Sequence, residues 1–303
     1  MRCLLMIVTI LLQGCHSTSP VGKTDVRPGA GQSQMIETVL AGLSDRADLM
    51  KTLHGWGVIE LQWQDEAGAH FEQGDLEFWL DGQDRLAVRV SKLGDTYFWI
   101  GTDGQDAWVF DLSERPKRLL VSSMKSILEN GSANDSWISI MDMIQMMQAG
   151  LGALPPPSSS DVLSLTATDE EAWVLVCRDP ADADRRIQFR LDPDTWRPLE
   201  VSLINNEGVV LLQAGTRSAR TRRLEIPGRP SVACPIVSAV IEVRDRTAED
   251  GLARFAFEGL TSDLSDQPME RLFDLKALKA GLRPEIEGSL VPTGSQDHDS
   301  SSH

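Results

Sequence analysis

The sequence is poor in the residues that most often carry out catalysis or bind metal ions. It has only five histidines and four cysteines in 303 residues. No Gly-x-Ser-x-Gly, His-Glu-x-x-His, phosphate-binding loop or zinc-type cysteine spacing occurs in it. The acidic run of Asp179, Asp182 and Asp184 fits a solvated hairpin turn better than a calcium site, because a full ligand set is not visible. We therefore expect no catalytic residue, no metal site and no cofactor.

Positive charge is also scarce. The chain has 29 Lys and Arg against 45 Asp and Glu, which gives a net charge of −16. Such a balance excludes a nucleic-acid partner, which requires a basic face. The main concentration of positive charge is Arg217, Arg220, Arg222 and Arg223. These arginines fit a solvated edge strand protected against pairing, or a surface for an acidic partner.

The chain has no apolar run of the ~20 residues that a membrane-spanning helix requires. Its longest early run, Cys3–Leu12, follows the basic Arg2 and has about half that length. The segment Leu-Gln-Gly-Cys that ends at Cys15 resembles a bacterial lipobox. This pattern predicts that residues 1–14 are removed as a signal peptide and that Cys15 is acylated. An ordinary secretory signal is the alternative.

The apolar pattern changes period along the chain. Residues 15–34 lack periodicity and predict a flexible tether. Three- and four-residue spacing then predicts a helix over 35–53, with His54 at its end. A two-residue period with Gly- and Asp-containing turns predicts short antiparallel strands from 55 to 121 and again from 163 to 257.

A methionine-rich insert separates the two groups of strands. Residues 136–151 predict a helix with a narrow polar stripe, and four methionines fall within seven residues of it. Such a helix fits an ordinary core element, or a soft lid over an apolar cavity. After the second group of strands, a short helix is predicted near 269–280, and residues 289–303 are predicted to be disordered. The folded body is therefore expected to span 35–288.

Two cysteines remain once Cys3 is removed with the signal peptide and Cys15 is assigned to lipid. Cys177 lies in an apolar strand pattern, and Cys234 precedes another apolar run. An exported protein could pair them as a disulfide. Two buried free thiols fit the sequence equally well.

Several segments resemble the bacterial lipoprotein-localisation proteins of LolA/LolB type, which comprise a soluble periplasmic carrier and a lipid-anchored outer-membrane receptor. The resemblance covers most of residues 36–260. The segments that carry it are 74–85, 91–94, 99–104, 108–110, 187–192 and 199–203.

The resemblance implies an α+β fold: an open, unclosed antiparallel β-barrel of about eleven strands, with helices as a lid over an apolar cavity for acyl chains. It also implies that Leu93 and Gly94 match a receptor turn whose leucine acts in membrane insertion or acyl transfer, although the proline of that turn is missing here. The carrier latches its lid with an arginine. Leu80 and Asp81 stand nearest to that position, so this latch is expected to be missing.

Together these observations predict a non-enzymatic, lipid-anchored monomer on the periplasmic face of the outer membrane. Its expected partners are acyl chains of lipoproteins or phospholipid, the membrane that holds its anchor, and a periplasmic carrier protein. A structural or signalling lipoprotein that binds a protein partner with the same fold is the alternative. The residues expected to line the cavity are Ile59, Leu61, Trp63, Phe78, Val88, Trp99, Met143 and Met147.

Overall fold

The computed structural model describes residues 30–290, apart from 66–67, 83, 131–134, 169–171, 181, 223, 226–231, 234–235, 247–250 and 263–268. Cys15, the signal peptide and Cys234 lie outside the described residues, so the predictions made for them stay predictions. Cys177 is a buried free thiol, and burial, aided by the nearby Asp161 carboxylate, raises its pKa to about 12.

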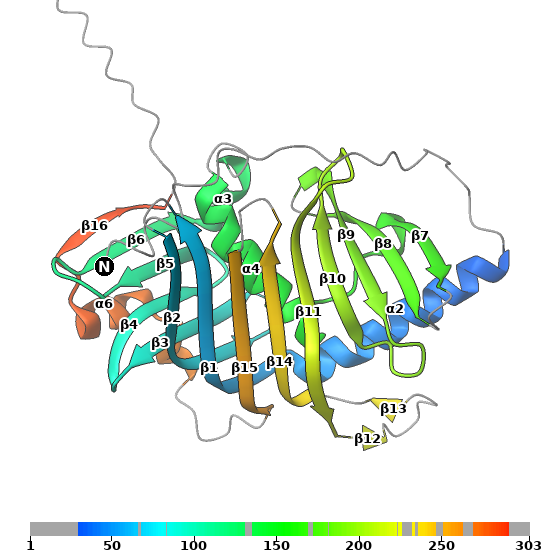
Figure 1. The fold of residues 1–303 in the computed structure, drawn as a ribbon, viewed down its shortest axis with the longest axis horizontal. Coiled ribbons are helices and arrows are strands. Elements are labelled where there is room, and N and C mark those ends of the chain that lie inside the picture. Colours follow the sequence, from blue (N-terminus) through cyan, green and yellow to red (C-terminus); the bar gives the residue numbers. More distant parts are fainter. Residues whose placement is uncertain are drawn as a thin grey trace, which may run out of the picture.

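Fourteen strands form one sheet in the order β16-β6-β5-β4-β3-β2-β1-β15-β14-β11-β10-β9-β8-β7 (Figure 1). All described pairs in it are antiparallel except that of β16 with β6. Because β16 and β7 form the two edges of the described sheet, the barrel is open. The predicted α+β class with an open antiparallel barrel is confirmed, with fourteen strands in place of about eleven.

The chain builds this sheet as two meanders that meet at β1 and β15. The first meander consists of β1 (Thr52–Asp65), β2 (Gly68–Asp81), β3 (Arg85–Lys92), β4 (Asp95–Thr102), β5 (Asp106–Asp111) and β6 (Arg118–Ser123). The second consists of β7 (Val162–Ala167), β8 (Trp173–Asp179), β9 (Asp182–Leu191), β10 (Pro198–Ile204), β11 (Val210–Thr221), β14 (Ile236–Asp245) and β15 (Gly251–Thr261). A separate two-stranded ribbon pairs β12 (Leu224–Glu225) with β13 (Val232–Ala233).

The inner face of the sheet, defined as the face that packs against α2 and α4, carries the main core. Helices α2 (Ala30–Met50) and α4 (Asp135–Leu151) pass behind β14 and β11 in Figure 1. Their apolar side chains join those of both meanders in one buried cluster. Arg46 of α2 is buried as well, and its guanidinium donates to the Thr195 carbonyl at 2.9 Å. This bond fixes α2 against the turn between β9 and β10.

The outer face is covered only in part. Helices α5 (Met269–Leu272) and α6 (Leu275–Leu282) pack on the outer side of β2 to β6, where Trp108 and Phe110 are fully buried. The chain then ends its described part in β16 (Ile286–Ser289), which pairs with β6. Where α5 and α6 cover β2 to β6, these strands therefore have a helical layer on each side, and both of their faces are apolar there.

Several local predictions differ from the structure. The first helix begins at Ala30, inside the predicted tether, and ends at Met50, so that His54 lies in β1. An additional helix, α3 (Met124–Asn130), precedes α4, and a 3-10 turn, η2 (Ser159–Asp161), precedes β7. The predicted helices at 136–151 and 269–280 are present as α4 and as α5 with α6.

The arginine-rich strand lies at an edge only over its second half. Strand β11 is placed between β10 and β14. Strand β10 pairs with its first half, up to Gly215, and β14 pairs with residues as far as Thr221. Arg217 and Arg220 lie beyond Gly215, where β11 pairs only with β14, so the predicted edge placement holds for this half of the strand and is wrong for the first half. Arg223 lies outside the described residues.

Candidate functional site

An apolar cavity of about 150 Å³ lies between the first meander and α4. Its wall comes mainly from β1, β2, β3 and β4, with Phe255 of β15 beside them and Met143 and Ile144 of α4 opposite. A few polar side chains, among them Glu72 and Lys92, also line it. Little but aliphatic and aromatic surface faces its interior, which suits an apolar ligand.

Strand alternation explains which residues form this wall. Val88 pairs with Ile100 and Val90 pairs with Phe98, so that all four side chains lie on the inner face. Gly74 lies in the same wall, where a Cβ atom would approach the Ser91 carbonyl oxygen to 2.9 Å. A side chain at this position would therefore push β2 and β3 apart.

Five of the eight residues predicted to line the cavity do so: Ile59, Leu61, Trp63, Val88 and Met143. Phe78 and Met147 belong to the same inner core, and both are fully buried in packing beside the cavity. The structure therefore brings seven of the eight residues to the inner side of the sheet, five on its strands and two on α4, and leaves one apart.

Trp99 lies on the outer face, and its predicted position in the cavity is corrected. It pairs with Arg89 and with Phe110, one residue out of phase with Ile100. There it stacks on Trp79 at 5.9 Å between ring centroids, and Trp79 stacks on His54 at 5.2 Å. The Arg89 guanidinium lies over both tryptophan rings. Burial and this cation lower the pKa of His54.

Several residues that line the cavity are not predicted by the sequence pattern. They are Val90, Tyr97, Phe98, Ile100, Ile144 and Phe255. Val90, Phe98 and Ile100 share the alternation of Val88, and a correct register between the two strands predicts them. Tyr97 is out of phase with these residues and lies at the irregularity between β3 and β4. Phe255 could not be placed in this way, because β15 meets β1 only in the folded chain.

Leu93 and Gly94 form the tip of the hairpin between β3 and β4, beside Lys92 at the cavity wall. The side chain of Leu93 is 97 % exposed. Leu93 and Gly94 have φ values of 55° and 88°, so both adopt the left-handed conformation that a two-residue hairpin turn requires. Lys92 pairs with Glu72 across the neighbouring strands at 3.0 Å. This almost fully exposed leucine thus projects from a tight turn next to the cavity.

A buried ionic network holds α4 to the hairpin between β8 and β9. Arg185 contacts Asp142 of α4 at 3.0 Å, Asp179 at 3.0 Å and Asp182 at 3.4 Å. Burial raises the pKa of Asp142 to about 6; Arg185 opposes this shift, and the other two carboxylates add to it. Asp179 is itself buried, so the acidic run is only partly the solvated turn that was predicted. The positions of Leu80 and Asp81, where the resemblance would place a latching arginine, hold no arginine. Arg185 of β9 instead contacts the lid helix α4 through Asp142.

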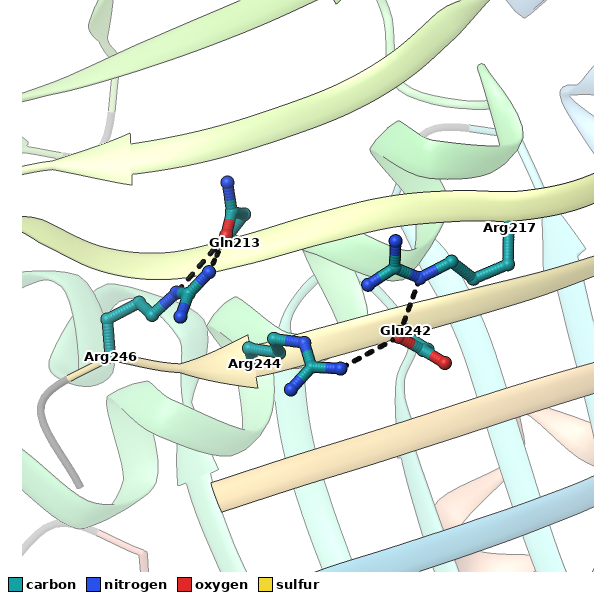
Figure 2. Close-up of polar contacts among 5 residues, drawn as sticks. All are labelled: Gln213, Arg217, Glu242, Arg244 and Arg246. Carbon is teal, nitrogen blue, oxygen red and sulfur yellow. Dashed lines mark hydrogen bonds and ion pairs between the residues drawn. The ribbon is translucent and has the colours of Figure 1, made fainter. Parts of the chain in front are cut away.

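A group of polar residues on the outer face of β11 and β14 contains three arginines (Figure 2). Glu242 accepts hydrogen bonds from Arg217 at 2.7 Å and from Arg244 at 3.1 Å. Burial of Glu242 opposes its ionisation, but these two hydrogen bonds outweigh it and lower its pKa. Arg246 donates to the amide oxygen of Gln213. The group therefore carries more positive than negative charge.

Within the described part of the chain, no cluster of His, Cys, Asp and Glu side chains is arranged to hold a metal ion. None of the described helices combines the length and apolar character needed to cross a membrane.

No sequence-family model matches the chain, and no curated protein matches it in sequence. Solved structures do match it. A DUF1329 family protein from Desulfovibrio piger is 13% identical with a TM-score of 0.51, covering 82% of this chain and 99% of its own. At such identity the similarity establishes the fold alone.

Two further structures are similar at lower TM-scores. A LolA superfamily protein from Nitrosomonas europaea is 12% identical with a TM-score of 0.44, covering 78% of this chain and 96% of its own. A domain described as an outer membrane lipoprotein-sorting protein, from Vibrio parahaemolyticus, is 10% identical with a TM-score of 0.47. The match covers 80% of this chain and 99% of that domain. The open antiparallel sheet with a helix across its inner face agrees with the architecture that the resemblance implied.

The raised pKa of Asp142 predicts a specific pH dependence of stability. Because this pKa is higher in the folded protein than in the unfolded chain, protonation stabilises the fold, and the free energy of unfolding falls as pH rises from about 4 to above 6. Asp142→Asn removes this contribution. In urea unfolding, the free energy of unfolding of the variant relative to that of the wild type should therefore rise by up to roughly 3 kcal/mol between pH 4 and 7.

Asp184→Asn, at an exposed position of the same hairpin, is the matched control and should follow the wild-type pH profile. Parallel profiles for Asp142→Asn and the wild type would contradict the burial of an ionisable Asp142.

Proposed function

We propose that this protein, which has a LolA/LolB-like fold, binds acyl chains in its apolar cavity while a lipid on Cys15 holds it in the cell envelope. The observation that carries this proposal is the cavity itself, bounded by β1 to β4 and the lid helix α4. Each methylene transferred from water into such a site contributes ~0.8 kcal/mol. The acyl chains of lipoproteins and of phospholipids both meet this requirement.

The size of the cavity indicates how a chain would enter. A dry apolar cavity of roughly 150 Å³ accommodates a molecule the size of benzene, so the space present here admits only a segment of an acyl chain. We propose that α4 moves away from the sheet to admit the rest. The methionines on its inner side, Met143 and Met147, can repack around chains of different shape because their side chains are flexible.

The proposed location is the periplasmic face of the outer membrane, with the protein as a stationary holder or acceptor of lipid. A tethered protein cannot diffuse through the periplasm, so acylation of Cys15 favours this role over that of a soluble carrier. A periplasmic carrier protein is then the proposed donor. A structural or signalling lipoprotein remains the second candidate, supported by the arginines that the outer face presents to solvent.

Introducing a charge into the cavity tests acyl-chain binding. Leu61→Asp places a carboxylate in the cavity wall and should lower the affinity for a fluorescent fatty acid by at least about tenfold, since burying an unpaired charge costs several kcal/mol. Val58→Asp, on the opposite face of the same strand, is the control and should bind like the wild type. Equal affinities of the two folded variants would refute the cavity as the binding site and favour the second candidate.

Lipidation is tested on the protein extracted from membranes. Mass spectrometry should find an N-terminus at Cys15 that carries a diacylglyceryl group, and Cys15→Ser should abolish both this modification and membrane retention. A mature N-terminus elsewhere, without lipid, would instead identify an ordinary secretory signal and make a soluble carrier the better assignment.

Leu93 is proposed to insert into the membrane or guide an acyl chain, because its exposed side chain stands at the cavity rim. Leu93→Glu should slow transfer of a fluorescent fatty acid from protein to vesicles while leaving its affinity in solution unchanged. The control Asp95→Glu, in the same turn, should transfer at the wild-type rate. Unchanged transfer by Leu93→Glu would remove this role.

A further inference from the structure

A second, polar pocket of about 460 Å³ shares a wall with the apolar cavity. Both are lined by Trp63, whose ring stacks on that of His70 at 5.0 Å between centroids. The polar pocket lies where β1 and β14 end and where β2 and β15 begin. Its other lining residues include Gln62, Gln64, Arg244, Asp245 and Arg246. Trp63 therefore lies between the apolar cavity and the polar pocket.

The polar pocket is locally positive in a strongly acidic protein. It is lined by two arginines and one carboxylate, that of Asp245, although the whole chain has a net charge of −16. Arg246 donates to Gln213, whose amide oxygen carries no formal charge to offset the guanidinium (Figure 2). Arg244 shares the single carboxylate of Glu242 with Arg217.

This arrangement matches an amphiphile with an anionic head. An acyl chain bound in the apolar cavity would place its head group at the rim of the sheet. The polar pocket lies at this rim, on the other side of Trp63, which lines both pockets. Guanidinium groups present planar pairs of N–H donors that suit phosphate and carboxylate oxygens. Gln62 and Gln64 add neutral donors for the same head.

We infer that Arg244 and Arg246 bind the phosphate or carboxylate head of the amphiphile whose acyl chain enters the apolar cavity. This inference rests on the proposed function and narrows its ligand from any acyl chain to a chain that carries negative charge. An acylated protein bound here would need an anionic group close to its chains. An anionic phospholipid or a fatty acid carries such a group itself.

Two single-chain amphiphiles with the same acyl chain test the inference. Calorimetry below their critical micelle concentrations compares lysophosphatidylglycerol, which is anionic, with the uncharged monoacylglycerol. The wild type should bind the anionic amphiphile about tenfold more tightly, the equivalent of one charge-assisted hydrogen bond. Arg246→Gln should bring the two affinities to within about twofold of each other, and Arg246→Lys, which keeps the charge but loses the fork, should give an intermediate ratio.

Arg220→Gln is the matched control. Arg220 lies on β11 and donates a hydrogen bond to the hydroxyl oxygen of Ser238 on β14 at 2.8 Å, so its partner is also uncharged. Arg220 does not line the polar pocket. This variant makes the same change of charge and should keep the tenfold preference. Loss of the preference in both variants would assign it to overall charge and overturn the inference.

Three other results would also overturn it. Equal binding of both amphiphiles by the wild type would leave the acyl-chain cavity standing and remove the head-group site. Binding of inorganic phosphate as tightly as lysophosphatidylglycerol would identify a site for free anions instead. Failure of the wild type to bind either amphiphile would refute the inference together with the proposed function.

Discussion

The pairing of β1 with β15 is the constraint on which the rest of the structure depends, because it joins two meanders that are far apart in the sequence. Once they are joined, β6 lies next to one edge of the sheet and β7 forms the other. The connection between these strands must therefore cross the sheet, and α4 is part of it. The lid position of α4 follows from topology, and its apolar residues allow it to cross on the inner face. The cavity lies where this crossing leaves the inner wall of β1 to β4 incompletely filled.

Much of this architecture could be predicted from the sequence, because alternation of apolar residues sets both the strands and their faces. Ile59, Leu61 and Trp63 alternate with the polar Glu60 and Gln62, and all three line the cavity, although the sequence did not settle which face of the strands points inward. The same logic failed for Trp99, because α5 and α6 bury the outer face of β4 and make both sides apolar. A strand buried on two faces carries no alternation from which its inner side could be read.

Other features depend on long-range contacts that local sequence does not encode. All four residues of β16 are exposed, so no apolar alternation predicts this strand. It is a strand because it pairs with β6. The sequence predicts a solvated turn at Asp179, whereas the structure buries this residue beside Arg185 in the network that also contacts α4. The polar pocket likewise joins residues of β1 and β2 to residues of β14 and β15, which meet only through the β1–β15 register.

The ionic network around Arg185 contributes to the free-energy cost of the proposed movement of α4. Moving the helix outward separates Asp142 from Arg185, but Arg185 keeps Asp179 and Asp182, so its buried charge is not left without partners. Asp142 returns to water, where its carboxylate ionises freely instead of being penalised by burial. The loss is therefore smaller than for an isolated buried ion pair. Six methylenes entering the cavity contribute about 5 kcal/mol, which is enough to exceed it. Protonation of Asp142 below about pH 6 therefore favours the closed position of α4, whereas at neutral pH the penalty on the buried carboxylate favours its release when an acyl chain enters.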